Sequence, residues 1–184
     1  MIKLAYDVGE YRKLLGETVS EGDVVVEIGP HVGKSTRAYM DRASKIFLID
    51  KGSDCEKALE KLAGENEKVT FIKEDARGFG AVKKVLARVK TCDVLAVDMG
   101  GGRYPDTVFK VWATWSGVFQ PRHSVIRNIG LIEFVGRAKV EDEKSREKFP
   151  DSGWLSQYGR KTPYKLKMQL DEFSHWININ EPLV

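Results

Sequence analysis

Residues 24–40 read VVVEIGPHVGKSTRAYM, and this stretch decides how the chain folds. Val24–Ile28 is rich in β-branched residues, Gly29 and Gly33 bracket a turn, and Lys34–Arg42 has the composition of a helix. A buried strand that enters a glycine-containing turn and then a helix is typical of a nucleotide-binding βαβ unit. The stretch therefore predicts a ligand-binding turn at the carboxyl end of a parallel strand.

Outward from this stretch, short apolar runs alternate with segments of helical periodicity. The predicted strands are Val24–Ile28, Lys45–Ile49, Val69–Lys73, Val94–Val97 and Ser124–Arg127. The predicted helices are Gly9–Val19, Lys34–Arg42, Cys55–Leu62, Ala81–Val89 and Asp106–Phe119. Because such alternation is the pattern of parallel βαβ units, we expect an α/β fold with a doubly wound, mostly parallel sheet. In the last helix, Trp112, Trp115 and Phe119 recur at helical spacing and are expected to face the core.

The chain beyond Asn128 has a different character. Leu131–Lys148 is predicted to be a helix that ends in a charge-dense segment. Lys161–Ile179 alternates with period two, so we expect a C-terminal antiparallel hairpin that closes the edge of the sheet. Between them, Trp154–Tyr164 mixes basic and aromatic residues, a composition that favours either a surface loop or contact with RNA.

Composition limits the classes of protein to consider. The 184 residues, 42% of them hydrophobic, suffice for a single domain spanning 1–184. No apolar run approaches the roughly 20 residues that a membrane helix needs, and the charged N-terminus does not resemble a signal peptide, so we expect a cytoplasmic protein. A net charge of +3 is too small to indicate nucleic-acid binding by itself. Cys55 and Cys92 lack metal-ligand spacing, so we expect buried thiols and no metal site.

The turn fails the test for a P-loop by one residue. A P-loop needs four residues between its first glycine and Gly-Lys-Ser, whereas Gly29 and Gly33 enclose only three. The missing glycine would fall at Ile28, whose branched side chain disfavours positive φ. Since Val94–Asp98 resembles a Walker B strand, a nucleotide-binding NTPase remains an alternative. The dinucleotide fingerprint GxGxxG also fails, because His31 replaces its second glycine.

What residues 27–33 do satisfy is E-x-G-x-x-x-G, and here the chain resembles the class I, Rossmann-like S-adenosylmethionine (SAM)-dependent methyltransferases. The resemblance extends over most of the chain, because acids end the next three strands in FLID, FIKED and VLAVD. It implies that Asp50 binds the ribose hydroxyls and that Asp75 binds the adenine amino group. It also implies that Asp98 faces the entering substrate.

The resemblance implies a role for the turn as well. Glu27 would accept a hydrogen bond from the ammonium end of SAM, while Gly29 and Gly33 would leave room for the methionine. The other residues that the resemblance places beside the cofactor are Pro30, His31, Ser35, Lys51 and Ala76. For His31, a cofactor contact and a packed imidazole remain open alternatives.

The residue types fit this chemistry. A carboxylate such as Asp50 accepts two hydrogen bonds from a vicinal diol, and an acidic pocket suits a cationic cofactor better than a phosphate. Any one of these acids could merely cap the next helix. Three acids at successive strand ends, however, fall on the ligand-binding edge of a doubly wound sheet.

The methyl acceptor is not identified by the sequence. Asp98 is followed by MGGGRYP rather than by the Pro-Pro-Tyr or Pro-Pro-Phe of enzymes that methylate exocyclic base amines. Arg127 ends the next strand where the ribose 2′-O-methyltransferases use a lysine, and arginine cannot act as a base. Asp98 is the candidate catalytic base, or it positions the substrate. RNA and small molecules remain candidate acceptors, and a non-catalytic methyltransferase-like binding module is a further alternative.

Overall fold

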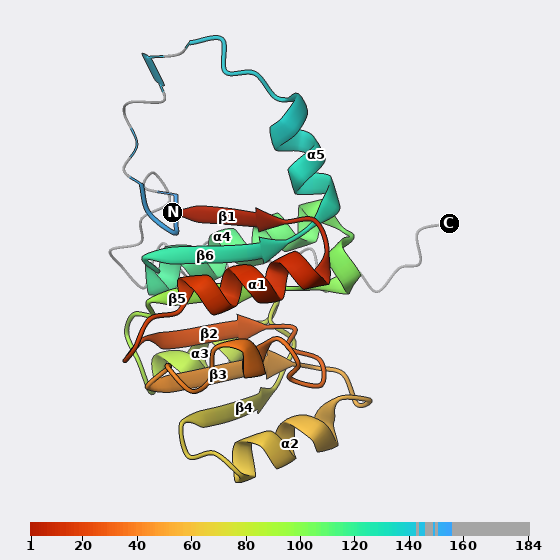
Figure 1. Ribbon diagram of the computed structural model, residues 1–184, viewed down its shortest axis with the longest axis vertical. Helices are drawn as coiled ribbons and strands as arrows, with labels where there is room; N and C mark the ends of the chain where they lie inside the picture. Colours follow the sequence, from red (N-terminus) through yellow and green to blue (C-terminus); the bar gives the residue numbers. More distant parts are fainter. Residues whose placement is uncertain (143, 146–148, 150, 156–184) are drawn as a thin grey trace.

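The computed structural model describes residues 1–142, 144–145, 149 and 151–155, and these form a single six-stranded sheet with helices on both faces (Figure 1). All strand pairs are parallel, in the order β1-β6-β5-β2-β3-β4. The strands are β1 (Ile2–Ala5), β2 (Val24–Ile28), β3 (Lys45–Asp50), β4 (Val69–Lys73), β5 (Val94–Val97) and β6 (His123–Arg127). The helices are α1 (Val8–Thr18), α2 (Glu56–Gly64), α3 (Phe79–Leu86), α4 (Pro105–Phe119) and α5 (Ile129–Arg137), with short 3-10 turns η1 (Thr36–Ala38) and η2 (Gly100–Gly102). The predicted doubly wound, parallel α/β fold is confirmed.

Two apolar layers hold the helices against the sheet. Side chains alternate along each strand, so Val25 faces the layer that contains α1 and α2, while Val26 faces the layer that contains α3 and α4. In that second layer Trp112, Trp115 and Phe119 are buried, as their spacing predicted. Cys55 and Cys92 are buried free thiols, as expected.

The strand order creates a switch point between β2 and β5. From β2 the chain proceeds outward through β3 to β4, and it then returns to the other side of β2 to form β5 and β6. The loops that follow β2 and β5 therefore leave the sheet side by side in opposite directions. In doubly wound sheets, ligands bind in the crevice that forms at this point.

The sequence did not reveal β1. Residues 2–5 pair in parallel with β6, with Ile2 opposite Ser124 and Ala5 opposite Arg127. The strand has only four residues and includes Lys3, so its periodicity is too short to recognise. Its stability comes from the neighbouring strand and from α1, which follows it directly.

Two predicted helices were wrong in part or in whole. Lys34–Arg42 forms only the three-residue turn η1, because buried hydrogen bonds described below hold this segment in another conformation. The helix predicted over Leu131–Lys148 begins earlier and ends earlier, at Ile129 and Arg137. It begins there because the side chain of Asn128 caps it, accepting a hydrogen bond from the Leu131 amide at 2.9 Å.

The hairpin predicted over Lys161–Ile179 lies outside the described residues, as does most of Trp154–Tyr164. Within the described part of the chain, no helix combines the length and the apolar composition needed to cross a membrane.

Candidate functional site

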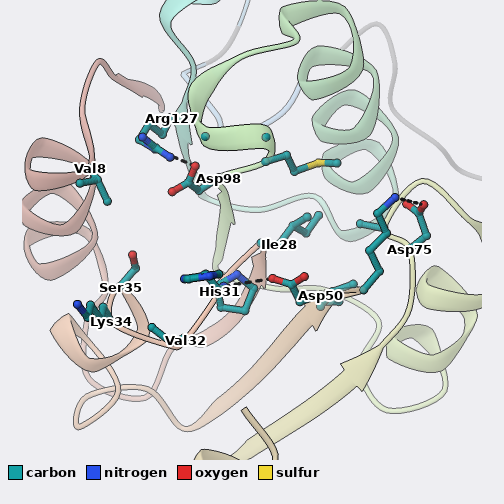
Figure 2. A pocket seen from close by; sticks show the side chains of 18 of the residues that line it. Val8, Ile28, His31, Val32, Lys34, Ser35, Asp50, Asp75, Asp98 and Arg127 are labelled. Carbon is teal, nitrogen blue, oxygen red and sulfur yellow. Dashed lines mark hydrogen bonds and ion pairs between the residues drawn. The ribbon is translucent and has the colours of Figure 1, made fainter. Parts of the chain in front are cut away.

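A cavity of about 430 Å³ lies at the switch point, bounded by the carboxyl ends of five strands and the first turns of α1 (Figure 2). The predicted site residues that line it are Gly29, Pro30, His31, Ser35, Asp50, Lys51, Asp75, Ala76 and Asp98. Glu27 and Gly33 are not part of this lining. Residues from β2, β3, β4 and β5 are thus brought together although they are up to 69 positions apart.

The turn after β2 approaches the end of β5 very closely. Gly29 has φ +76°, and a Cβ atom at this position would lie 2.1 Å from the carbonyl oxygen of Asp98. Only glycine combines this backbone conformation with the absence of a side chain. Gly33, with φ +73°, instead packs against α2, because a Cβ there would lie 2.8 Å from Leu62 Cδ2. Gly29 therefore joins the turn to Asp98, whereas Gly33 makes room for α2 rather than for a ligand.

The backbone of this turn is not arranged like a P-loop. A P-loop directs successive N–H groups at a phosphate, in front of a helix whose dipole assists. Here the His31 amide donates to Asp50 Oδ2 at 3.2 Å, and the Gly33 amide donates to the Pro30 carbonyl at 2.9 Å. The element that follows is η1, which has only three residues. This geometry argues against the NTPase alternative.

Asp50 ends β3 and its carboxylate borders the cavity (Figure 2). Oδ1 accepts a hydrogen bond from the Gly52 amide at 2.9 Å, and Oδ2 accepts the bond from His31. A carboxylate has about four acceptor positions, so each oxygen keeps capacity for a ligand. The imidazole of His31 is not packed, since it is 68% exposed and its Nε2 lies 3.4 Å from Asp54 Oδ2.

Asp75 is held by two cations. Its Oδ2 lies 2.6 Å from Arg77 Nη2 and 3.1 Å from Lys51 Nζ. Burial alone would raise the pKa of this carboxyl, but the hydrogen bonds from Arg77 and Lys51 outweigh it and hold the pKa well below its usual range. Asp75 is therefore an ionised acceptor whose oxygens are already engaged, and a ligand amino group would have to share them.

Asp98 follows β5 and forms a largely buried ion pair with the end of β6. Its Oδ1 accepts a hydrogen bond from Arg127 Nε at 2.8 Å, and the two side chains are 11% and 17% exposed. Burial raises the pKa of Asp98, although Arg127 opposes this effect. Among the described residues, no hydrogen bond reaches Oδ2, so this oxygen is available to a ligand.

Glu27 lies beneath the cavity rather than in its wall. The alternation of β2 directs its side chain toward α1 and η1, where it is fully buried. Oε2 accepts hydrogen bonds from Thr36 Oγ1 at 2.7 Å and from the Tyr39 hydroxyl at 2.6 Å. Burial raises the pKa of Glu27 to about 7, against the effect of these two hydroxyls. These bonds explain why residues 34–42 do not form the predicted helix.

Within the described residues, Glu27 Oε1 has no hydrogen-bond partner, and neither has the buried hydroxyl of Tyr11 on α1. Desolvation, followed by the nearby charges of Glu27 and Asp98, raises the pKa of Tyr11 well above its ordinary value. The buried side chains of Tyr11 and Glu27 thus each keep one polar atom without a partner among the described residues.

Arg12 is a lining residue that sequence reasoning missed. It lies on α1 one turn after Val8, which also lines the cavity. The helix that carries Arg12 was predicted correctly. Arg12 reaches the cavity because α1 packs against β1 and β6, and this tertiary contact leaves no local signal in the sequence.

Comparisons with known proteins were made by sequence and by structure. No family model matches the chain. A stretch of 61 residues is 34% identical to the ribosomal RNA small subunit methyltransferase A of Clostridium botulinum. This match covers 33% of the chain and 22% of the length of that relative, so the chain spans only about a fifth of the curated proteins it matches.

Two solved structures have a similar fold. A protein from Pyrococcus horikoshii, described as a candidate RNA methyltransferase, has a TM-score of 0.51 at 12% identity, covering 69% of this chain and 64% of that one. A candidate rRNA methylase from Clostridium thermocellum has a TM-score of 0.50 at 16% identity, covering 76% and 83%. At such low identity the likeness shows the fold alone, which is the α/β fold with a parallel sheet described above.

Proposed function

We propose that this chain, which has the fold of the class I SAM-dependent methyltransferases, binds SAM in the cavity and transfers its methyl group to RNA. The observation that carries the cofactor assignment is the carboxylate of Asp50. It ends β3 beside the turn of Gly29, and both of its oxygens keep acceptor capacity toward the cavity. A ribose offers two neighbouring hydroxyl donors, which is the pattern that such a carboxylate binds.

The remaining lining residues fit the other parts of the cofactor. Asp75 would accept a hydrogen bond from the adenine amino group, and its ion pair with Lys51 would weaken in consequence. Ser35 and Pro30 would bound the methionine tail where the turn meets α1. When bound, SAM supplies a methyl group on a sulfonium, which is a good leaving group.

Asp98 is the residue proposed to face the acceptor. Its Oδ2 is free to accept a proton or a hydrogen bond from the acceptor, while Arg127 fixes Oδ1. Burial raises the pKa of Asp98, and this makes it a stronger base than an exposed aspartate. Holding the acceptor in line with the methyl group supplies much of the rate enhancement in methyl transfer. A base therefore matters most when the acceptor atom carries a proton of high pKa.

The RNA acceptor is supported by the relative of 34% identity, which is a ribosomal RNA methyltransferase. The two proteins of similar fold are candidate RNA methyltransferases. A small-molecule acceptor is the competing assignment, and a binding module without turnover is the other. Turnover of methyl-labelled SAM on separated RNA, protein and small-molecule fractions of a cell extract distinguishes them. Label in RNA that disappears with Asp98→Asn supports the proposal, whereas label only in another fraction, or none, contradicts the RNA assignment.

Cofactor binding is tested by calorimetry with SAM, S-adenosylhomocysteine and ATP with magnesium. Asp50→Ala removes two charge-assisted hydrogen bonds, each worth about 1.5–3 kcal/mol, so the Kd for SAM should rise about 100-fold or more. Asp54→Ala is the matched control, because Asp54 lies in the same loop with an exposed side chain. Unchanged affinity for SAM in Asp50→Ala, or tighter binding of ATP than of SAM, would contradict the cofactor assignment.

A further inference from the structure

One side of the cavity carries two carboxylates, one of them paired with Lys51, and the other side carries cations. Asp50 and Asp75 lie on one side, whereas Lys34, Ser35 and Val8 lie together on the other (Figure 2). Arg12, one helical turn beyond Val8, belongs to this second side. A ligand that spans the cavity therefore meets hydrogen-bond acceptors first and positive charge at its far end.

Arg12 differs from Lys51 and Arg127, two other cations of the cavity, because it has no partner among the described residues. Lys51 is paired with Asp75, and Arg127 is paired with Asp98. Arg12 forms no hydrogen bond or ion pair with any described residue, and its Nε is buried without an acceptor. Asp98 is the acid whose pKa it lowers, but Arg127 already occupies Oδ1 of that carboxylate.

A buried guanidinium nitrogen without an acceptor is costly, and folded proteins rarely leave one in this state. The planar fork of an arginine matches a carboxylate in a bidentate pair, which is the strongest neutralising contact available to it. An anionic group on the ligand would therefore suit Arg12 as a partner.

We propose that Arg12 binds the α-carboxylate of the amino-acid tail of the bound nucleoside. This inference rests on the proposed function, because it requires SAM to lie with its ribose at Asp50. Arg12 is a binding residue for the cofactor, and it takes no part in the chemical step.

The test compares SAM with decarboxylated SAM, which differs only in lacking the carboxylate, by calorimetry on the full chain. In the unsubstituted protein, SAM should bind at least tenfold more tightly than its decarboxylated form. Arg12→Gln should weaken SAM about tenfold or more and leave decarboxylated SAM unchanged or tighter, because a cation no longer repels it. Arg12→Lys keeps the charge without the fork and should fall between the two.

Lys13→Gln on the same helix is the matched control, since its side chain is 63% exposed and is not part of the cavity lining. Binding of decarboxylated SAM by Arg12→Gln shows that the pocket is still folded. If Arg12→Gln weakens both ligands equally, its role is structural and the inference is wrong. The inference is also wrong if SAM binding is unchanged and only RNA binding is weakened, because the anion is then an acceptor phosphate. If the unsubstituted protein binds neither nucleoside, the proposed function itself fails.

Discussion

Replacing Glu27 by Gln should make the stability of the protein less dependent on pH. The carboxyl group is fully buried on the α1 side of β2, and burial raises its pKa from an ordinary value of 4.5 to about 7. Between these two values the folded chain holds a proton that the unfolded chain has released. The stabilisation is complete below pH 4.5 and is lost as the pH rises through 7, because the folded chain must then bury a charge.

The magnitude follows from the two pKa values. At about 1.36 kcal/mol per pKa unit, the difference corresponds to about 3 kcal/mol of unfolding free energy. Glutamine does not ionise, so the unfolding free energy of Glu27→Gln should rise relative to that of the unsubstituted protein by up to about 1.4 kcal/mol for each pH unit in this window. Above the window the gain should level off near 3 kcal/mol. A constant penalty from the unpaired amide would displace the whole curve without changing its slope.

Urea denaturation at a series of pH values from 4.5 to 8.5 measures this difference. Glu60→Gln is the control, because Glu60 lies exposed on α2, and its curve should run parallel to that of the unsubstituted protein. A difference between Glu27→Gln and the unsubstituted protein that stays constant with pH, or shrinks as the pH rises, would refute the reasoning.

Three further substitutions test the contacts that hold the site and the core. Gly29→Ala should lower the unfolding free energy by about 3 kcal/mol or more, because a left-handed backbone and a close backbone contact both oppose a side chain. A loss below about 1 kcal/mol in urea denaturation would contradict this. Trp115→Phe removes the 2.7 Å hydrogen bond from Nε1 to the Ala76 carbonyl and should lower the unfolding free energy by about 1–3 kcal/mol in the same assay. An unchanged unfolding free energy would mean that the carbonyl finds another donor. Arg122→Ala leaves the buried carboxylate of Asp23 without its 2.9 Å partner and should lower the unfolding free energy by about 1–2 kcal/mol at pH 7. Adding Asp23→Asn should recover most of that loss. If the effects of the two substitutions simply add, the two side chains do not interact directly.

The strands were predictable because their signal is local. Runs such as Val94–Val97 are apolar throughout, and a run of this kind between helical segments has few other arrangements open to it. The acids after β3, β4 and β5 could be placed at one edge for the same reason, since the carboxyl ends of parallel strands share that edge. Their gathering around one cavity followed from topology alone.

The failures have tertiary causes. Residues 34–42 have helical composition, but Thr36 and Tyr39 donate to the buried carboxyl of Glu27, and that bonding replaces the helix. The same burial removes Glu27 from the cavity wall, which the motif alone could not reveal. Arg12 reaches the cavity only because α1 packs beside β1 and β6, and β1 was itself too short to recognise.

The contact between Gly29 and the carbonyl of Asp98 gives the site a mechanical property. The two loops touch backbone to backbone, with no side chain between them to absorb movement. Any displacement of the first loop would therefore act directly on the strand end that carries the Asp98 carboxylate. Neither loop can therefore be redesigned in isolation.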